Sequence, residues 1–496
     1  MNILFLLADQ LRSDFVGSFG ADFIQTSAID SLAEDGVLYE NAISQAPICV
    51  PIRAAMMSGL NPIQSGVIGN DHWLDPRWRE MGLKTWPLAL SEAGYHTFGL
   101  GKMHFYPWDI MEGFDERLIS EDKRHIPIKD NYADHLANNG MQKLYGWEEE
   151  GYRENLGASY SGIPLEHMTD VWMGDEFIKF TDRHDKSKPF ATMVGFNGPH
   201  CPYNPPKEIA ELFNPSDMPQ PIPDTDVSET FREHCIRGAN LPWCQIDYTD
   251  FPTDAKMKIR AHYCGLVKII DDQVGRIIQD LKDKDLYDDT LIIFGSDHGD
   301  YLGDYSLIAK STFLQPSIHV PLIVKPPKGT QAVAGTRVQT HVAMSDIFAT
   351  IMRAANQDIP DFVDSTPLPA LFDDPKPELR THIFGANRAG QMVMKGDWIL
   401  AHYEFGTRSL FNLKEDPTEQ INRYHDPAAR SVRDELNEIL IDENMKASND
   451  RSRSLLITPG ELKYKMGFGE RGWVRGSPYP GFDDPYRANS NKNLLS

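Results

Sequence analysis

A single cysteine lies in the segment ICVPIRAAMMSG, which runs from Ile48 to Gly59. Cys49 stands two residues before a proline and four before Arg53, and no second cysteine or histidine follows at the spacing of a zinc knuckle. One half of a disulfide would not need the arginine. The pattern indicates that Cys49 is a reactive group or the precursor of one.

Four short apolar runs elsewhere in the chain end in polar residues that could do chemistry. Runs of this length, bounded by glycine and proline, predict buried strands. The runs and their polar ends are ILFLLADQ with Asp9 and Gln10, TFGLGKMH with Lys102 and His104, PFATMVGFNGPH with His200, and TLIIFGSDHGD with Asp297 and His298.

Helical patterns lie between these runs, such as TSAIDSLAEDG after the first run and the long AKMKIRAHYCGLVKIIDDQVGRIIQDLKD before the last. Strands that alternate with helices predict an α/β fold, in which helices sandwich a large, mixed and mostly parallel sheet. In such sheets ligands bind beyond the carboxyl ends of the strands. All four polar clusters are therefore expected to face one crevice.

The pattern changes near residue 375. The runs THIFGANR, QMVMKGDWILAHY and RSLFNL predict a small antiparallel sheet, with a closing helix around AARSVRDELNEILIDENM. We therefore predict a catalytic α/β domain over residues 1–375. Residues 376–496 are predicted to form a C-terminal subdomain that ends in an irregular tail.

The net charge of −23 argues against a nucleic-acid partner or an anionic membrane surface. It also means that an anionic substrate would need a locally basic cleft. No run approaches the roughly 18 apolar residues of a membrane span. A homo-oligomer is left open.

The opening MNILFLLADQ lacks a basic region and a cleavage site, so it predicts a first strand rather than an export signal. The five cysteines show no framework spacing, which favours a reducing compartment. We therefore expect a cytoplasmic protein. A periplasmic or secreted chain whose signal had been removed would look the same.

The sequence resembles the sulfatase family of the alkaline phosphatase superfamily. The resemblance covers nearly the whole chain, and the matching segments stand in the family's motif order. CVPIRAAMMSG resembles the signature in which an enzyme oxidises the cysteine to formylglycine. The resemblance thus implies a maturation enzyme as a partner and Cys49 as the source of the nucleophile. The other matching segments are GKMH (Gly101 to His104), GPHCPY (Gly198 to Tyr203), SDHGDYLGDYSLIAK (Ser296 to Lys310) and FNLKEDPTEQIN (Phe411 to Asn422).

The resemblance implies one divalent metal ion, with Asp9, Gln10, the oxidised Cys49, Asp297 and His298 as its ligands. Oxygen ligands suit Ca²⁺ or Mg²⁺, and the nitrogen of the histidine also suits Mn²⁺. We expect Ca²⁺ ahead of the other two.

The resemblance also implies catalytic roles around a sulfate ester. Arg53 and Lys102 are expected to hold the nucleophile and the sulfate oxygens, a task that suits a fork-shaped guanidinium. His104 is expected to take a proton from the hydrated formylglycine. His200, with Lys310 nearby, is expected to bind the bridging oxygen and protonate the departing alcohol.

Some residues depart from the usual pattern of the family. Gln10 stands where many sulfatases have a second aspartate, His298 where many have asparagine, and Ser58 where the signature usually has threonine. The first two variants resemble the branch that contains choline sulfatases and phosphonate or phosphodiester monoester hydrolases. In that branch Asn70, in GVIGNDHW, is expected to touch the sulfate.

The predicted function is a sulfatase that hydrolyses a sulfate monoester and releases inorganic sulfate and an alcohol. Sulfated carbohydrates, choline sulfate and aryl sulfates all stay open as substrates. One alternative is a phosphonate monoester or phosphodiester hydrolase on the same scaffold. Another is a non-catalytic binder of sulfated ligands that keeps Cys49 unmodified.

Overall fold

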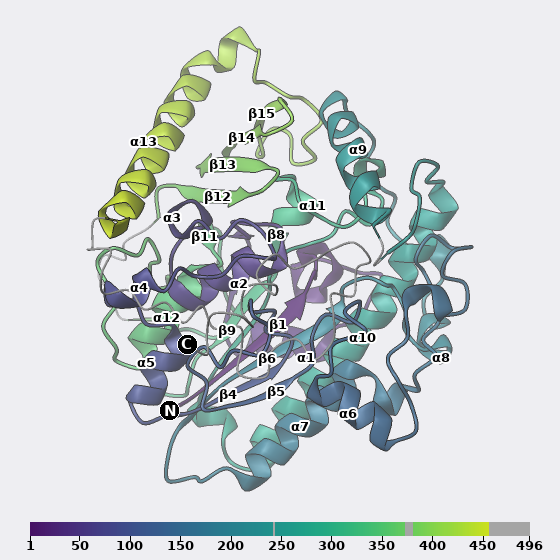
Figure 1. The fold of residues 1–496 in the computed structure, drawn as a ribbon, viewed down its shortest axis with the longest axis vertical. Coiled ribbons are helices and arrows are strands. Elements are labelled where there is room, and N and C mark those ends of the chain that lie inside the picture. The colour runs from purple at the N-terminus through teal and green to yellow at the C-terminus, as the bar shows by residue number, and fades with distance from the viewer. Residues whose placement is uncertain (242–243, 373–379, 456–496) are drawn as a thin grey trace, which may run out of the picture.

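The structure is a computed structural model that describes residues 1–241, 244–372 and 380–455 (Figure 1). Its large sheet has the strand order β10–β2–β9–β7–β1–β6–β4–β5. The strands are β1 (Asn2–Asp9), β2 (Val37–Tyr39), β4 (His96–Gly101), β5 (Glu116–Ile119), β6 (Phe190–Pro199), β7 (Thr290–Ser296), β9 (Leu322–Lys325) and β10 (Thr336–Val338). Within this sheet only β9 runs antiparallel to its neighbours. The predicted mixed, mostly parallel sheet is confirmed.

The apolar sequence of β1 follows from its position inside the sheet. Alternate residues of a strand point to opposite faces. Leu4 and Leu6 belong to the core on one face, whereas Phe5 and Leu7 belong to the core on the other. Because both faces are covered, the strand is continuously apolar between Asn2 and Asp9 rather than alternating with polar residues.

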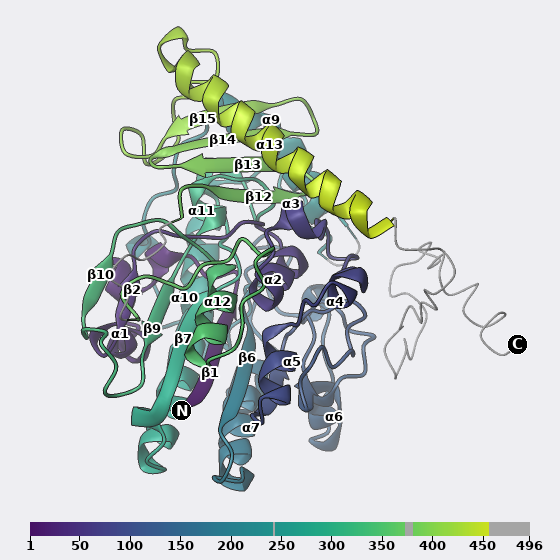
Figure 2. The ribbon, with the colours of Figure 1, turned by 90° about the vertical axis from the view of Figure 1, so that its left-hand side faces the viewer.

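Helices cover both faces of the sheet (Figures 1 and 2). One core includes α1 (Ser27–Glu34), α7 (Thr169–Arg183) and α10 (Thr253–Asp283), and the other includes α2 (Cys49–Ser58), α5 (Trp86–Glu92) and α12 (Asp346–Ala354). The other α-helices that precede the small C-terminal sheet in the sequence are α3 (Pro62–Ser65), α4 (Arg77–Glu80), α6 (Asn131–Asn138), α8 (Lys207–Ala210), α9 (Asp226–Ala239) and α11 (Gln315–Ile318). None of the helices in the described ranges is long and apolar enough to span a membrane.

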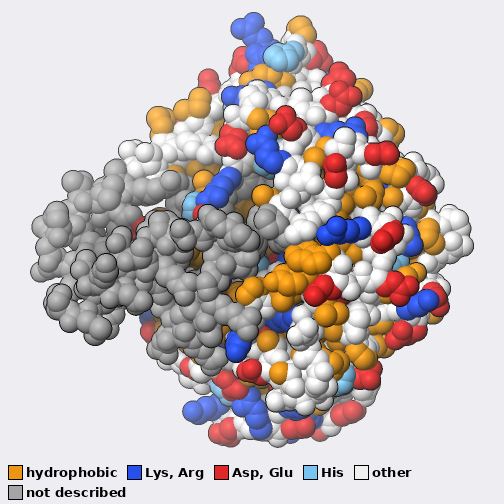
Figure 3. Space-filling view, turned by 45° about the vertical axis from the view of Figure 1, so that its right-hand side comes forward, with side chains coloured by type: hydrophobic (Ala, Val, Ile, Leu, Met, Phe, Trp, Pro, Cys, Tyr) orange, Lys and Arg blue, Asp and Glu red, His pale blue; other side chains and the backbone are white. Residues whose placement is uncertain are grey.

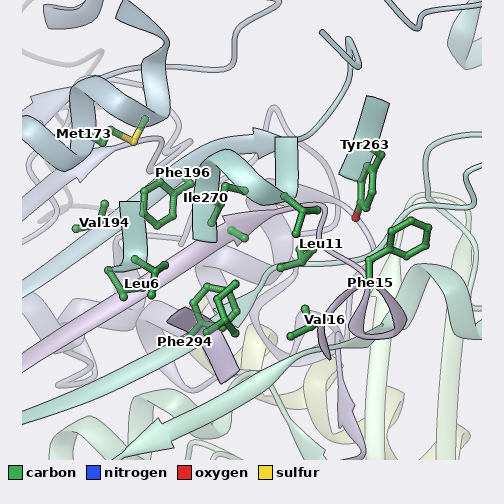
Figure 4. Close-up of a cluster of buried hydrophobic side chains, with 14 of the residues drawn as sticks. Leu6, Leu11, Phe15, Val16, Met173, Val194, Phe196, Tyr263, Ile270 and Phe294 are labelled. Atoms are coloured by element: carbon green, nitrogen blue, oxygen red, sulfur yellow. The ribbon is translucent and has the colours of Figure 1, made fainter. Parts of the chain in front are cut away.

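Figure 4 shows how the first of these cores is filled. Leu6 of β1, Val194 of β6 and Phe294 of β7 lie under Ile270 of α10 and Met173 of α7, and all five side chains are fully buried. Burying a large apolar side chain stabilises the fold by about 1.5–3 kcal/mol. This core therefore fixes the strands whose ends carry the predicted chemistry.

Two smaller sheets lie outside the large one. The first joins β11 (Val342–Ala343), β3 (Ala42–Ile43) and β8 (His319–Val320). The second is the antiparallel sheet β12 (Ile383–Asn387), β13 (Gly390–Lys395), β14 (Trp398–Tyr403) and β15 (Arg408–Asn412), crossed by the long helix α13 (Arg430–Leu455) in Figure 2. The predicted small antiparallel sheet is confirmed. The predicted domain boundary at residue 375 and most of the predicted tail fall outside the described residues, so both stay predictions.

The strand register sets the place of the candidate site. Asp9 pairs with Pro199, Ala8 with Ser296, and Gly101 with both Gly195 and Ile119. The carboxyl ends of β1, β4, β5, β6 and β7 therefore meet at one edge of the sheet. The residues that follow these strands in the sequence come together there.

A substitution at Gly195 of β6 tests how tightly the strands pack at this edge of the sheet. A Cβ atom at this glycine would lie 2.1 Å from the carbonyl oxygen of Lys102, whose N–H donates to Gly195 at 2.7 Å. We expect Gly195→Ala to lower the free energy of unfolding by about 1–3 kcal/mol in a urea titration, because the backbone must move. In the matched control Gly238→Ala, the added methyl has open space in α9, so stability should hold or rise. Equal stability for the two variants would contradict the packing described.

Candidate active site

Four of the predicted residues form one buried cluster. Asp9 ends β1, Cys49 begins α2, and Asp297 and His298 follow β7. Each side chain offers one donor atom, these atoms lie within 4.8 Å of one another, and all four residues are fully buried. Segments separated by up to about 290 residues of sequence thus meet at the edge where parallel sheets bind ligands.

The start of α2 explains the spacing of the cysteine signature. Ile48 is extended and Cys49 is the first helical residue, so Arg53 lies one turn further along the same face. Pro51 falls in the first turn, where the backbone N–H groups have no partner within the helix and proline is tolerated. Every residue of α2 is buried. The helix therefore holds both side chains in a fixed relation.

The Cys49 thiol lies among charges. Its sulfur is 3.3 Å from Nε2 of His298 and 3.9 Å from Oδ1 of Asp9. Burial and Asp9 raise the pKa of the thiol, but Lys102, Lys310 and His298 outweigh them and lower it to about 6. The site favours an anion at this position, as the N-terminus of a helix does in general.

Arg53 joins the two carboxylates of the cluster. Its Nε donates to Asp297 at 2.9 Å, its NH2 group pairs with Asp9 at 3.2 Å, and its NH1 group donates to the carbonyl oxygen of Lys102. The guanidinium is fully buried. A buried charge left without a partner is costly, so these three contacts determine where β1, β4 and β7 end relative to α2.

Lys102 extends the ion-pair network beyond the residues predicted from the sequence. Its ammonium is 2.5 Å from Asp9 and 2.8 Å from Asp122, and Arg124 donates to both oxygens of Asp122 at 2.9 and 2.8 Å. Burial raises the pKa of Asp122, but Arg124 and Lys102 outweigh it and hold the pKa well below its ordinary value. Asp122 therefore carries a negative charge between two cations.

His200 and Lys310 lie together, and Nε2 of His200 is 3.8 Å from Oδ2 of Asp122. Nδ1 of His200 is 2.6 Å from the carbonyl oxygen of Cys201, an atom that only accepts, so Nδ1 carries the proton. Nε2 then accepts from the ammonium of Lys310 at 2.9 Å. Burial, Lys310 and Arg124 lower the pKa of His200 well below its ordinary value, so the imidazole is neutral.

Gln10 follows Asp9 and contacts both Asp297 and Lys310. Its backbone N–H donates to Asp297 at 3.0 Å, and its side-chain oxygen accepts from Lys310. Its amide nitrogen donates to Asp300, whose Oδ2 also accepts from the hydroxyl of Tyr203 at 2.7 Å. The predicted metal contact of Gln10 stays a prediction.

His104 and Asn70 also lie at this edge. His104 follows Lys102 with a left-handed backbone (φ 54), and its Nδ1 is buried without a hydrogen-bond partner among the described residues. Burial and Lys102 hold the pKa of His104 well below its ordinary value. The side-chain oxygen of Asn70 accepts from the N–H of Val50 at 3.1 Å, which places the amide next to Cys49.

Sequence reasoning missed the segment SEDKRH, residues 120–125, which supplies Asp122 and Arg124. It directly follows β5, so it reaches the same edge as the other strand ends. The signal that could have indicated these residues is the charged run EDKRH, residues 121–125, after a short strand. The weak periodicity of this region concealed the strand itself.

The donor set fits a hard divalent cation. Asp9 and Asp297 offer carboxylate oxygens and His298 offers a nitrogen. The sulfur of Cys49 stands where an oxygen would stand after oxidation to formylglycine, which would leave a mostly oxygen set of the kind that Ca²⁺, Mg²⁺ and Mn²⁺ accept.

Asp122 offers a test of the ion-pair network. We expect Asp122→Asn to lower the free energy of unfolding by about 3 kcal/mol, because the buried Lys102 and the partly buried Arg124 both lose a charged partner. The matched control is Asp14→Asn, since Asp14 is one of two carboxylates on the buried Arg12 but is itself exposed. Asp14→Asn should lower the free energy of unfolding by less than about 1 kcal/mol. Urea titrations at neutral pH measure both values, and equal losses would contradict the network.

Comparisons with known proteins show which family the sequence resembles. A family model described as Sulfatase matches residues 1–357, and one described as N-sulphoglucosamine sulphohydrolase, C-terminal, matches residues 303–446. An arylsulfatase of Clostridium perfringens is 27% identical over 470 residues, which cover 89% of this chain and 94% of the relative. A choline-sulfatase of Rhizobium meliloti is 26% identical and covers 86% of this chain and 83% of its own length.

Among solved structures, the phosphonate monoester hydrolase of Agrobacterium radiobacter superposes with a TM-score of 0.79 at 24% identity. The match covers 90% of this chain and 96% of that one. At this identity the likeness establishes a shared fold. The family model covers most of the chain and includes the whole cluster around Cys49. The chain therefore belongs to the sulfatase family, and its sulfatase relatives indicate a sulfuric ester hydrolase.

Proposed function

We propose that this protein hydrolyses an anionic sulfate monoester through a formylglycine formed from Cys49, and releases inorganic sulfate and an alcohol. Membership of the sulfatase family implies a divalent metal and a formylglycine in general. The observation that carries the proposal is the position of Cys49 at the buried start of α2, among Asp9, Asp297 and His298.

We favour Ca²⁺ as the metal, ahead of Mg²⁺ and Mn²⁺. The ligands proposed are Asp9, Gln10, the oxidised residue 49, Asp297 and His298, and four of the five offer oxygen. When bound, the cation would supply Lewis acidity, which lowers the pKa of the nucleophilic oxygen and draws charge from the sulfate.

Local charge supports an anionic substrate despite the net charge of −23. The cationic side chains at the site are Arg53, Lys102, Arg124 and Lys310, and the carboxylates are Asp9, Asp122, Asp297 and Asp300. The two sets balance, and burial raises the pKa of the adjacent Glu121 to about 7, so one divalent cation would still make the site positive. On the face drawn in Figure 3, acidic and basic side chains are interspersed rather than gathered by sign. Attraction for sulfate would thus arise at the buried site itself.

The proposed roles follow from the contacts. Arg53 and Lys102 stabilise negative charge at residue 49 and on the sulfate oxygens. His104 is neutral and has a buried nitrogen without a partner, so it can accept the proton that residue 49 must lose. Asn70, next to Cys49, is proposed to donate to a sulfate oxygen.

His200 and Lys310 are proposed to protonate the leaving group. The proton held between Nε2 of His200 and Nζ of Lys310 is the one offered to the bridging oxygen as the alcohol departs. This help matters most when the departing alkoxide is strongly basic.

For the alcohol we propose a sulfated carbohydrate. The support is the match of residues 303–446 to a C-terminal model named for a hydrolase of N-sulphoglucosamine. A phosphonate monoester or phosphodiester hydrolase is the second candidate, favoured by Gln10 and His298 at positions where many sulfatases differ. The maturation enzyme, the cytoplasmic location and a homo-oligomer stay predictions.

A substrate panel separates these functions. Matured protein would be offered sulfated saccharides, choline sulfate, an aryl sulfate and the matching phosphonate ester, with released sulfate or phenol as the readout. We expect sulfate esters to be the better substrates and Cys49→Ala to lose at least about 1,000-fold in kcat/KM, because the nucleophile is absent. Faster cleavage of the phosphonate would favour the second candidate. An intact thiol at Cys49 in protein from the native source, with no turnover, would favour a binding protein.

The leaving-group role of His200 has a distinct signature. We expect His200→Ala to lower kcat/KM about 100-fold for alkyl sulfates, whose alkoxides need a proton. The loss in kcat/KM should be much smaller for nitrophenyl sulfate, because its nitrophenolate leaving group departs without a proton. The control is His262→Ala, another buried histidine, whose Nδ1 contacts the carbonyl oxygens of Ser159 and Tyr203. Equal losses for both substrates in His200→Ala would remove its acid role.

A further inference from the structure

A second group of side chains that could hold a metal shares His104 with the proposed active site. His104 follows β4, and Glu121 and His125 follow β5. Each offers one ligand atom, and the three atoms lie within 4.8 Å of one another. The two imidazole rings meet edge to face, with centroids 5.7 Å apart. None of these residues belongs to the cluster around Asp9.

The three side chains have free capacity for a ligand. Nδ1 of His104 is buried and has no hydrogen-bond partner in the described part of the chain. The carboxylate of Glu121 is buried and accepts from the backbone N–H groups of His104 at 3.2 Å and Asp122 at 3.3 Å. Burial raises the pKa of Glu121 to about 7, so a cation beside it would be favoured. His125 is partly exposed, which gives an ion a path to the group.

The donor types distinguish this group from the Asp9 cluster. Two imidazoles and one carboxylate form a common zinc-binding set that leaves a fourth position open. Burial lowers the pKa of His104 and that of His125, the latter to about 3, so both rings are neutral and each keeps a lone pair for a metal. Nitrogen-rich sites favour Zn²⁺ over Ca²⁺, which prefers oxygen.

We propose that His104, Glu121 and His125 form a zinc site separate from the Asp9 centre, and that Zn²⁺ bound there stops turnover. A neutral imidazole has one nitrogen with a lone pair and one with a hydrogen. If Zn²⁺ takes the lone pair of His104, its other nitrogen carries the hydrogen and neither can accept a proton. The inhibition rests on the proposed function, whereas the binding does not.

Zinc stoichiometry tests the site itself. The full chain would be dialysed against ZnCl₂ in excess CaCl₂, and bound zinc would be measured by atomic emission. We expect His125→Asn to bind one equivalent less than the unmutated chain, and Glu121→Gln to bind that equivalent more weakly. His234→Asn is the control, because this half-buried histidine of α9 packs on Phe405, away from the group. Equal stoichiometry in the His125→Asn and His234→Asn variants, both folded by circular dichroism, would overturn the site.

Turnover tests the inhibition. With CaCl₂ present, saturating ZnCl₂ should lower the hydrolysis rate of the matured protein about 100-fold, because a general base contributes at least about that factor to the rate. His125→Asn should keep its rate at the same zinc concentration, and His234→Asn should be inhibited like the unmutated chain. Equal inhibition of all three would place the effect at the Asp9 centre and overturn the regulatory part. If no ester is hydrolysed at all, the proposed function fails while the dialysis result stands.

Discussion

The bridge that Arg53 makes between Asp9 and Asp297 is the interaction on which the site depends. Both carboxylates and the guanidinium are fully buried, so each charge is stable only if the others stay in place. The bridge ties β1 and β7 to the first turns of α2. Cys49 is thereby held beside the carboxylates. The fold achieves this with an ordinary helix, because residues four apart share a face.

Around this bridge, charges are balanced in pairs rather than isolated. Lys102 pairs with Asp9 and Asp122, and Arg124 holds the other side of Asp122. Such a network explains how a strongly acidic protein can present a site suited to an anion. The carboxylates position the cations, and a divalent ion would add the excess positive charge. The field at the site is therefore set mainly by these buried charges, because solvent and salt screen the charges of the outer surface.

Much of the fold and part of the site could be predicted from the sequence, for definite physical reasons. β1 and β7 are apolar because both of their faces are buried, and parallel strands bring Asp9 and Asp297 to one edge. The spacing of Cys49 and Arg53 is helical. Asp122 and Glu121 could not be found in this way, because they follow β5, a four-residue strand at the margin of the sheet. Their partners become visible only once the register of β4 and β5 is known. Likewise, nothing in the sequence indicated that Gln10 contacts Lys310 and Asp300.

A crystal structure of protein purified from its native source, with Ca²⁺ in the crystallisation medium, is the most direct measurement of the central claim. The account predicts one ion bonded to Asp9, Asp297 and an oxygen of residue 49, with Arg53 still joining the two carboxylates. An unmodified thiol at position 49, with no ion between the carboxylates, would contradict it.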